Sequence, residues 1–350
     1  MIVGFACFLA LLVAWIVTRL MMAWAIADVP DAARKLHRAS TPTAGGVGIM
    51  AGTLVGYIYL SWHFAFVVSE AWTCLGLALA GGALGFWDDR SAIGPKIKLL
   101  IMIAITSVFV IGGMRIEGLL VWPGVDLELG PLVGGLGTLL WLLVMVNVVN
   151  FMDGANGLSI GSSAVGLACL SGLCWAESTF GAAGPTNIAI VGSYVQICAL
   201  ASCGFLYWNV NGGRIFAGDA GALFVGLAIG ALGVWAAIWE VNPLSVATCF
   251  LPLLADSILT IVWRACQKAN LLKPHADHVY QLAIRAGRSH LQVAAPYWLA
   301  TGLCGAVALL ATIGGVIWIS LGFGLCLLSL IVILERQRAH FLALLSKQAG

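Results

Sequence analysis

The sequence predicts an all-α, polytopic integral membrane protein with about eleven (ten or eleven) transmembrane helices. Composition, the length of the apolar stretches and the placement of charge lead to this fold class. Of the 350 residues, 61% are hydrophobic and only 9% are charged. A soluble domain carries about 25% charged residues, so this chain cannot cover itself with a polar surface.

Eleven apolar stretches reach about 20 residues, the length that crosses a bilayer core as a helix. We expect their ends to shift by several residues. They run near residues 2–24, 44–62, 70–87, 97–113, 132–150, 158–180, 186–207, 220–240, 243–263, 293–315 and 316–334. The last two are joined so tightly that a count of ten is also open. The first is long enough to span and lacks a basic start, which favours a membrane helix over a cleaved signal peptide.

The chain shows no internal repeat and no separable soluble part, so we expect a single transmembrane domain over residues 1–350. The longest polar segment, residues 264–292, predicts one large loop with an amphipathic helix on the membrane surface. The ten cysteines lie in or beside apolar stretches, and we interpret them as small buried hydrophobic residues.

The basic residues fall almost entirely on one side of the predicted membrane. Loops that follow odd-numbered spans hold nearly all of the 17 Lys and Arg, and only Arg115 falls on the other side. By the positive-inside rule those loops are cytoplasmic and the N-terminus lies outside. Most aspartates share the basic side, which the rule does not require. A face rich in both Asp and basic residues indicates a functional site.

The first motif on this side begins at Asp28 and contains Lys35 and Arg38, followed by Gly45-Gly46. Bases beside a Gly-rich helix start predict an anion site, because exposed helix N–H groups favour phosphate. A positive anchor loop is the alternative.

The second motif is Asp88-Asp89, at the end of the third span. Adjacent carboxylates at a membrane boundary repel each other and are costly to desolvate. Mg²⁺ removes that cost and takes one or two carboxylates together with phosphate oxygens. Lys98 follows closely and is a candidate for phosphate. The alternative is a solvated helix cap.

The third motif places Asn147 and Asn150 one helical turn apart, ahead of Asp153-Gly154 and Asn156-Gly157. Two amides on one face of an apolar helix require a partner or a ligand. A purely structural helix and turn is the alternative.

The fourth motif runs from Asn209 through Phe216 to Asp219 and Gly221. Small residues around Asp219 let the backbone approach a ligand closely. A simple turn is the alternative.

Three further residues stand out later in the chain. His275 and His278 favour phosphate contact or a general polar role over zinc, which would require more ligands. A surface histidine pair without a function is the alternative. Asp256 lies inside the ninth span, and it is either functional or paired with Arg264 or another helix.

The four motifs, in this order and on one predicted face, resemble the polyprenyl-phosphate N-acetylhexosamine-1-phosphate transferase family. That family includes the enzyme that makes lipid I and the initiators of O-antigen, enterobacterial common antigen and teichoic acid linkage units. The resemblance extends from about Asp28 to His290. It implies transfer of N-acetylhexosamine-1-phosphate from a UDP-sugar to undecaprenyl phosphate, with release of UMP and with Mg²⁺ (or Mn²⁺ as a substitute) as cofactor.

The resemblance also implies a cytoplasmic active site in a bacterial inner membrane. Its expected partners are a UDP-N-acetylhexosamine, undecaprenyl phosphate and membrane lipids, and no nucleic acid is expected. A homodimer stays open.

The resemblance assigns roles residue by residue. The positions matching catalytic residues are Asp88, Asp89 and Asp153, with Asp88 a proposed base. Those matching metal ligands are Asp219, Asp89 and Asp153. Those matching nucleotide-binding positions are Asn209, Phe216, Gly154 and Asn156. The candidates for phosphate or lipid are Lys35, Arg38, Lys98, Asn147, Asn150, His275 and His278.

The chain departs from the family pattern in three places. A third acid after Asp88-Asp89 is missing, Asn156 replaces a second Asp, and His278 has no adjacent histidine. The segments Tyr280-Gln281 and Ala286 to His290 look more like the O-antigen-initiating branch, which implies a donor other than a muramyl peptide, with a 6-deoxy sugar among the options.

Two other classes of protein remain as alternatives. A transporter predicts charges buried at mid-membrane and repeated halves, whereas here the polar groups cluster at one face, only Asp256 is clearly mid-span and no repeat is visible. A catalytically inactive scaffold of the same fold is suggested by Asn156 and would tolerate mutation of Asp219. A CDP-alcohol phosphotransferase is disfavoured because its spaced acidic motif is absent.

Overall fold

The computed structural model describes residues 1–24, 27–28, 41–64, 68–91, 93–180, 188–271, 273 and 275–349. Lys35 and Arg38 of the first motif lie outside these residues.

Helices make up most of the described chain. The long helices are α1 (Ile2–Trp24), α2 (Gly46–His63), α3 (Ser69–Ser91), α4 (Pro95–Ile111), α5 (Gly130–Phe151), α6 (Leu158–Phe180), α7 (Ile188–Val210), α8 (Gly218–Ile238), α12 (His290–Gly314) and α13 (Val316–Ala349). The shorter helices are α9 (Pro243–Thr248), α10 (Leu251–Cys266) and α11 (Val279–Arg285). Two small antiparallel pairs join β1 (Ala27–Asp28) to β2 (Thr41–Pro42) and β3 (Gly118–Trp122) to β4 (Val125–Glu128).

Ten of the eleven predicted stretches coincide with one helix each, and the ninth is divided. Residues 243–263 form α9 and α10, with a break at Cys249 and Phe250. Pro243 and Pro252 each stand in the first turn of their helix. Proline is tolerated in a first turn because the N–H that it lacks has no partner there, so a second proline within this stretch favours a second helix start.

Seven described helices are long and apolar enough to cross a membrane: α1, α5, α6, α7, α8, α12 and α13. They confirm an all-α, multi-pass membrane protein. The remaining predicted spans are shorter or carry more polar residues; α4 has 17 residues and α10 has 16. A total of eleven spans therefore stays a prediction.

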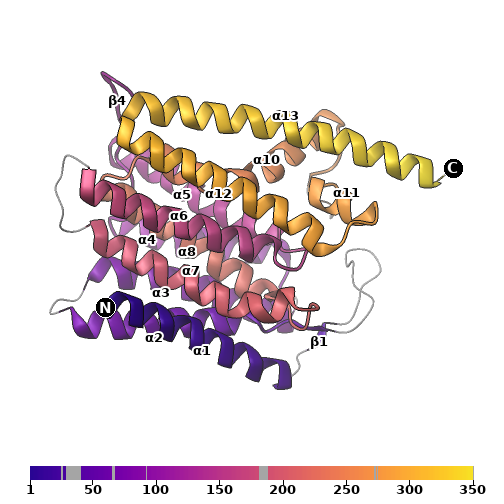
Figure 1. The fold of residues 1–350 in the computed structure, drawn as a ribbon, viewed down its shortest axis with the longest axis horizontal. Coiled ribbons are helices and arrows are strands. Elements are labelled where there is room, and N and C mark those ends of the chain that lie inside the picture. The colour runs from indigo at the N-terminus through magenta and orange to yellow at the C-terminus, as the bar shows by residue number, and fades with distance from the viewer. Residues whose placement is uncertain are drawn as a thin grey trace.

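The long helices lie side by side, with α1 and α2 along one edge of the bundle and α13 along the other (Figure 1). Helix α8 is central, since residues Ala220 to Ala236 are all buried, and it packs most extensively against α3 and α5. Small residues allow this close packing. A Cβ added to Gly46 of α2 would lie 2.2 Å from the backbone nitrogen of Gly221 in α8.

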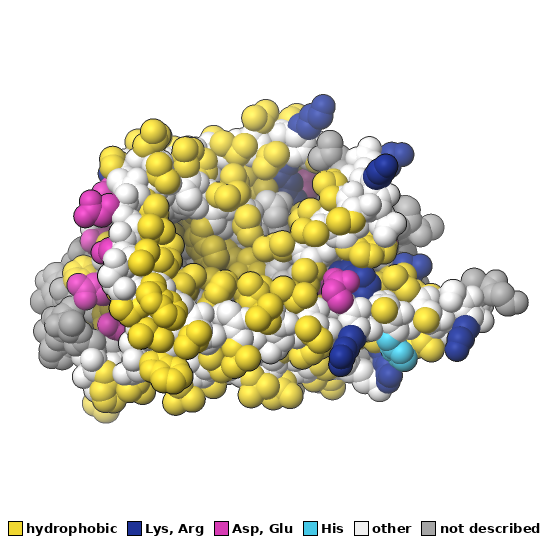
Figure 2. Space-filling model, turned by 90° about the horizontal axis from the view of Figure 1, so that it is seen from above, with side chains coloured by type: hydrophobic (Ala, Val, Ile, Leu, Met, Phe, Trp, Pro, Cys, Tyr) yellow, Lys and Arg dark blue, Asp and Glu magenta, His cyan; other side chains and the backbone are white. Residues whose placement is uncertain are grey.

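Charge is separated along the bundle. On the face seen in Figure 2, Lys and Arg gather at the end that carries the C-terminus, and Asp and Glu lie mainly at the other end. Hydrophobic side chains cover most of this face and line a hollow in it. The separation agrees with the one-sided basic pattern of the sequence.

The cysteines are free thiols, and seven of the ten are buried. Burial confirms the interpretation as small buried hydrophobic residues for these seven, whereas Cys203 and Cys266 are exposed and Cys169 is partly buried. The surface helix expected in residues 264–292 is the short α11 in the structure. Its apolar residues, among them Val279 and Leu282, are buried because α11 packs against α12 and α13.

Candidate functional site

The acidic residues of the second and fourth motifs meet where the end of α3 contacts the start of α8. Asp88 and Asp89 lie in the last turn of α3, and Asp219 lies in the first turn of α8. Gly85, one turn earlier in α3, makes this contact possible. A Cβ at Gly85 would lie 2.2 Å from the carbonyl oxygen of Asp219, so only glycine fits.

Asp89 caps α8 from the neighbouring helix. Its Oδ1 accepts a hydrogen bond from the backbone N–H of Asp219 at 3.0 Å, and its Oδ2 accepts one from that of Ala220 at 3.2 Å. The first N–H groups of a helix have no partner inside the helix and attract negative charge. Gly218, at φ 67°, leaves room for this carboxylate, because a Cβ there would lie 2.6 Å from its Oδ2.

Lys98 of α4 joins the other two carboxylates. Its Nζ lies 2.8 Å from Oδ2 of Asp88 and also forms an ion pair with Asp219. Asp88 is held further by the backbone N–H of Ile93, which donates to its Oδ1 at 2.6 Å. The ammonium group therefore lies between two carboxylates from different helices.

Asp153 faces the same group of acids from the loop between α5 and α6. The hydroxyl of Ser159 donates a hydrogen bond to its carboxylate. Burial, opposed by that bond and reinforced by the negative charges of Asp219 and Asp89, raises the pKa of Asp153 to about 7. A bound cation would act in the opposite direction and favour the carboxylate.

The donor set at this place fits a hard cation that is completed by phosphate oxygens. The described residues contain no group of three or more His, Cys, Asp or Glu side chains arranged to hold a metal alone. Mg²⁺ typically takes one or two carboxylates with substrate phosphates and water, and Asp88 with Asp219 supplies two. Lys98 already shows that a cation is accommodated between them.

Comparison with known proteins places this arrangement in a family. The model of glycosyl transferase family 4 matches residues 71–237, a range that contains Asp88, Asp89, Asp153 and Asp219. A probable undecaprenyl-phosphate N-acetylglucosaminyl 1-phosphate transferase of Bacillus subtilis (strain 168) is 26% identical over 325 residues, which cover 89% of this chain and 84% of that protein.

Two further relatives carry related names. The undecaprenyl-phosphate alpha-N-acetylglucosaminyl 1-phosphate transferase of Escherichia coli (strain K12) is 27% identical over 79% of this chain and 74% of its own. A phospho-N-acetylmuramoyl-pentapeptide-transferase of Corynebacterium diphtheriae is 27% identical over 69% of this chain and 77% of its own. The chain is thus similar to members of the polyprenyl-phosphate N-acetylhexosamine-1-phosphate transferase family.

Asn209 connects two loops of the site. It is buried, its Oδ1 accepts from the N–H of Gly157 at 2.6 Å, and its Nδ2 donates to the carbonyl of Ile215 at 2.9 Å. Both ends of the amide are thus bonded within the protein. The predicted contact of Asn209 with a nucleotide is not tested by these bonds, but they show a structural role that the sequence did not indicate.

The other predicted nucleotide residues lie around the same loops. The side chain of Phe216 is partly exposed, and its backbone N–H donates to the carbonyl of Pro42 at 2.8 Å. The N–H of Asn156 donates to Nδ1 of His290 at 3.2 Å. Gly154 faces the hydroxyl of Tyr280, which a Cβ would approach to 2.3 Å. The fold thus brings the third and fourth motifs together.

The side-chain amides of Asn147 and Asn150 in α5 lie in different surroundings. Asn147 donates from Nδ2 to the carbonyl of Leu143 in its own helix at 2.7 Å, which partly satisfies it without a ligand. Asn150 lies one turn further along and is partly buried. Their predicted contact with phosphate or lipid stays a prediction.

The described part of the first motif joins the fourth. The N–H groups of Gly45 and Gly46 donate to the carbonyls of Phe216 and Ala217, both at 3.0 Å. These bonds, with the one from Phe216 to Pro42, bring the start of α2 beside the start of α8.

His275 and His278, which stood out late in the sequence, lie at the beginning of α11. The rings of His275 and His278 lie 5.1 Å apart, and Nδ1 of the buried His278 lies 3.8 Å from Oδ1 of Asp256. His275 has its Nδ1 3.7 Å from the carboxylate of Asp277. Both imidazoles therefore lie beside carboxylates, and their predicted phosphate contact stays a prediction.

Asp256 holds α11 in place. Its carboxylate accepts from the N–H of Val279 at 3.0 Å and from the hydroxyl of Tyr297 at 2.6 Å. Of the two pairings considered from sequence, the one with Arg264 is wrong, because Arg264 pairs with Asp277 instead. Pairing with another helix is confirmed. A carboxylate in an apolar span can reach any neighbouring element, and sequence spacing alone does not select one.

Tyr280 is a residue that sequence reasoning did not assign to the site. Its hydroxyl donates to the carbonyl of Phe151 at 2.8 Å, next to the loop of Asp153. Its only signal in the sequence is its position after His278, in a segment that resembles the O-antigen-initiating branch. The link from Asp256 through α11 to the end of α5 depends on the tertiary fold.

Proposed function

We propose that the protein transfers N-acetylhexosamine-1-phosphate from a UDP-sugar to undecaprenyl phosphate, forming undecaprenyl-diphosphate-sugar and UMP. The observation that carries the proposal is the group of Asp88, Lys98 and Asp219 at one end of a membrane-spanning bundle. The names of the relatives, which mention undecaprenyl phosphate and N-acetylglucosaminyl 1-phosphate transfer, support the same reaction.

In the proposed reaction an oxygen of the lipid phosphate attacks the β-phosphorus, which carries the sugar. A new P–O bond forms, and the bond from that phosphorus to the bridging oxygen breaks, so that the bridging oxygen leaves with UMP. A phosphate monoester is already largely ionised near pH 7, since its second pKa is about 6. Catalysis then depends on positioning and charge neutralisation more than on proton removal.

The proposed cofactor is Mg²⁺ between Asp88 and Asp219, with phosphate oxygens completing its coordination. When bound it would neutralise the charge of the pyrophosphate. Asp89 is committed to capping α8, so its proposed role is to hold Asp219 in position. The proposed role of Lys98 is to pair with a phosphate when a metal binds Asp88 and Asp219 in its place.

The proposed location is a bacterial inner membrane with the carboxylate end in the cytoplasm, where UDP-sugars are made. The concentration of Lys and Arg at one end of the bundle supports this orientation (Figure 2). The proposed pathway is the initiation of a cell-surface polysaccharide such as O-antigen, with a UDP-N-acetylhexosamine as donor.

The test is release of UMP by the purified protein in detergent, given UDP-N-acetylglucosamine, undecaprenyl phosphate and Mg²⁺. We expect release that requires both the lipid phosphate and the metal, and we expect Asp219→Asn to abolish it. Asp126→Asn is the matched control, because Asp126 is an exposed acid of β4, away from the site. Equal release by the wild type and Asp219→Asn would contradict the proposed site. If the wild type releases no UMP with any UDP-N-acetylhexosamine, an inactive scaffold is favoured.

A further inference from the structure

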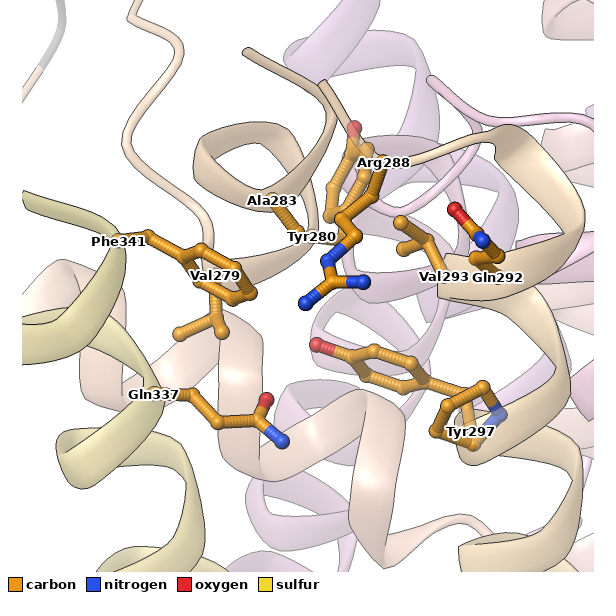
Figure 3. Close-up of a pocket in the computed structure, with 10 residues that line it drawn as sticks. Val279, Tyr280, Ala283, Arg288, Gln292, Val293, Tyr297, Gln337 and Phe341 are labelled. Carbon is orange, nitrogen blue, oxygen red and sulfur yellow. The ribbon is translucent and has the colours of Figure 1, made fainter. Parts of the chain in front are cut away.

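A pocket of about 240 Å³ lies between α11, α12 and α13, apart from the carboxylates (Figure 3). Its wall is mostly apolar and is formed by Val279, Ala283, Val293, Pro296 and Phe341. No Asp or Glu lines it, and the buried Asp256 behind its wall accepts hydrogen bonds from the lining residues Val279 and Tyr297. The pocket therefore suits a ligand with a large apolar part.

One cation points into this apolar pocket. Figure 3 shows the guanidinium of Arg288 directed toward its centre, with the carboxamide of Gln337 on the opposite wall. Among the described residues no carboxylate pairs with Arg288, whereas Arg264 pairs with Asp277. A guanidinium presents several N–H donors in a planar fork that matches phosphate oxygens. The pocket thus offers a phosphate the guanidinium of Arg288 and the carboxamide of Gln337, and it is also lined by Gln292 and Tyr297.

The ring of Tyr280 separates this pocket from the carboxylates. The ring lines the pocket, while its hydroxyl points away from the pocket's centre and donates to the carbonyl of Phe151, beside the Asp153 loop. A phosphate held by Arg288 is therefore on the far side of Tyr280 from Asp153. The ring of Tyr280 would separate an acceptor phosphate bound there from Asp153, so we assign the pocket a role other than transfer.

The surroundings of the pocket match a lipid. The helices that form it, α12 and α13, carry large exposed apolar side chains such as Leu299, Leu303 and Leu328. The pocket lies toward the end of the bundle where basic side chains gather, the part of a membrane protein that meets anionic headgroups. An anionic headgroup in the pocket would let its acyl chains run along these two helices.

We propose that this pocket binds an anionic phospholipid, with its phosphate on Arg288 and Gln337 and its acyl chains against α12 and α13. The site is separate from the carboxylates and takes a structural lipid of the membrane as its ligand. Its occupancy ties α11 to α12 and α13, three elements that are distant in sequence order from the acidic motifs.

The experiment is native mass spectrometry of the full-length protein in detergent with added phosphatidylglycerol, measuring the dissociation constant of the first bound lipid. We expect Arg288→Ala to weaken that binding about tenfold, the effect of losing a hydrogen-bonded charge pair. Gln337→Trp should weaken it too, because an exposed residue of the wall is replaced by one that fills the pocket. Arg336→Ala is the matched control: it removes one exposed charge from the adjacent position of α13, which does not line the pocket.

Four outcomes decide the proposal. Selective loss in Arg288→Ala and Gln337→Trp, with Arg336→Ala within about twofold of the wild type, supports it, because a general surface-charge effect would weaken both arginine variants alike. Equal loss in both arginine variants overturns it. Phosphatidylcholine binding as tightly as phosphatidylglycerol overturns it as well. If undecaprenyl phosphate or inorganic phosphate displaces the lipid at equal concentration, the pocket is a general phosphate or acceptor site, and the proposal fails.

Discussion

The ammonium nitrogen of Lys98 lies 2.8 Å from Oδ2 of Asp88 and pairs at the same time with Asp219, 121 residues further along the chain. The three side chains come from α4, α3 and α8, so the pairing exists only in the folded bundle. It places a positive charge where a divalent cation would bind under the proposed function. A lysine and a metal would therefore compete for one pair of carboxylates.

Lys98→Met tests this competition. We expect transfer to fall by about 10- to 100-fold, since a charged hydrogen-bonding partner is lost. At the same time we expect Mn²⁺, followed by electron paramagnetic resonance, to bind more tightly, because two carboxylates lose their internal counter-charge. The control is Lys96→Met, one position from the helix start and exposed. Weaker Mn²⁺ binding in Lys98→Met would argue that the lysine supports the metal site and does not compete for it.

Asn209→Leu tests whether this amide acts on the structure or on the nucleotide. The substitution leaves the N–H of Gly157 and the carbonyl of Ile215 without their partner, and each buried unpaired group costs about 1–3 kcal/mol. We expect a lower midpoint of thermal unfolding in detergent. A rise in KM for the UDP-sugar with an unchanged unfolding midpoint would instead identify Asn209 as a nucleotide ligand.

Gly85→Ala should separate α3 from α8. The new Cβ would lie 2.2 Å from the carbonyl oxygen of Asp219, so the two helices must move apart. The hydrogen bonds from the first N–H groups of α8 to the carboxylate of Asp89 must then lengthen. We expect loss of both thermal stability and transfer. Gly76→Ala in the same helix is the control, because its Cβ would meet nothing within 4 Å and alanine favours a helix by up to about 1 kcal/mol over glycine. A stable, active Gly85→Ala protein would contradict the proposed packing of the site.

Asp256→Asn should loosen α11. An amide keeps only one of the two acceptor oxygens, so either the bond from Val279 to Oδ1 or the bond from Tyr297 to Oδ2 is lost and an N–H group faces that donor. We expect a cost of about 1–3 kcal/mol. Hydrogen exchange of residues 278–290 should become faster, and transfer should fall because Tyr280 no longer supports Phe151. Tyr297→Phe removes one of these bonds without placing a new N–H donor against another donor, and it should give a smaller change. Unaltered exchange in Asp256→Asn would mean that other contacts hold α11.

Much of the fold was predictable because a membrane-spanning helix depends on the apolarity of consecutive residues in the sequence. Ten stretches each matched one helix since length and apolarity are properties of consecutive residues. The break between α9 and α10 was missed, although Pro252 marks it, because apolarity continues across the break. The acidic motifs were found for a similar reason: charged residues at the ends of apolar stretches stand out.

The sequence alone determined that the chain is a multi-pass helical protein, that its bases share one end, and that Asp88, Asp89, Asp153 and Asp219 are the acids to consider. Only the tertiary structure decided how the side chains pair. It assigned Asp89 to the start of α8, Lys98 to two carboxylates and Asp256 to α11. The physical reason is that a hydrogen bond or ion pair depends on distances of about 3 Å between atoms. Those distances are set by packing between separate helices, 130 positions apart for Asp89 and Asp219, 121 for Lys98 and Asp219, and 23 for Asp256 and Val279. No local pattern records them.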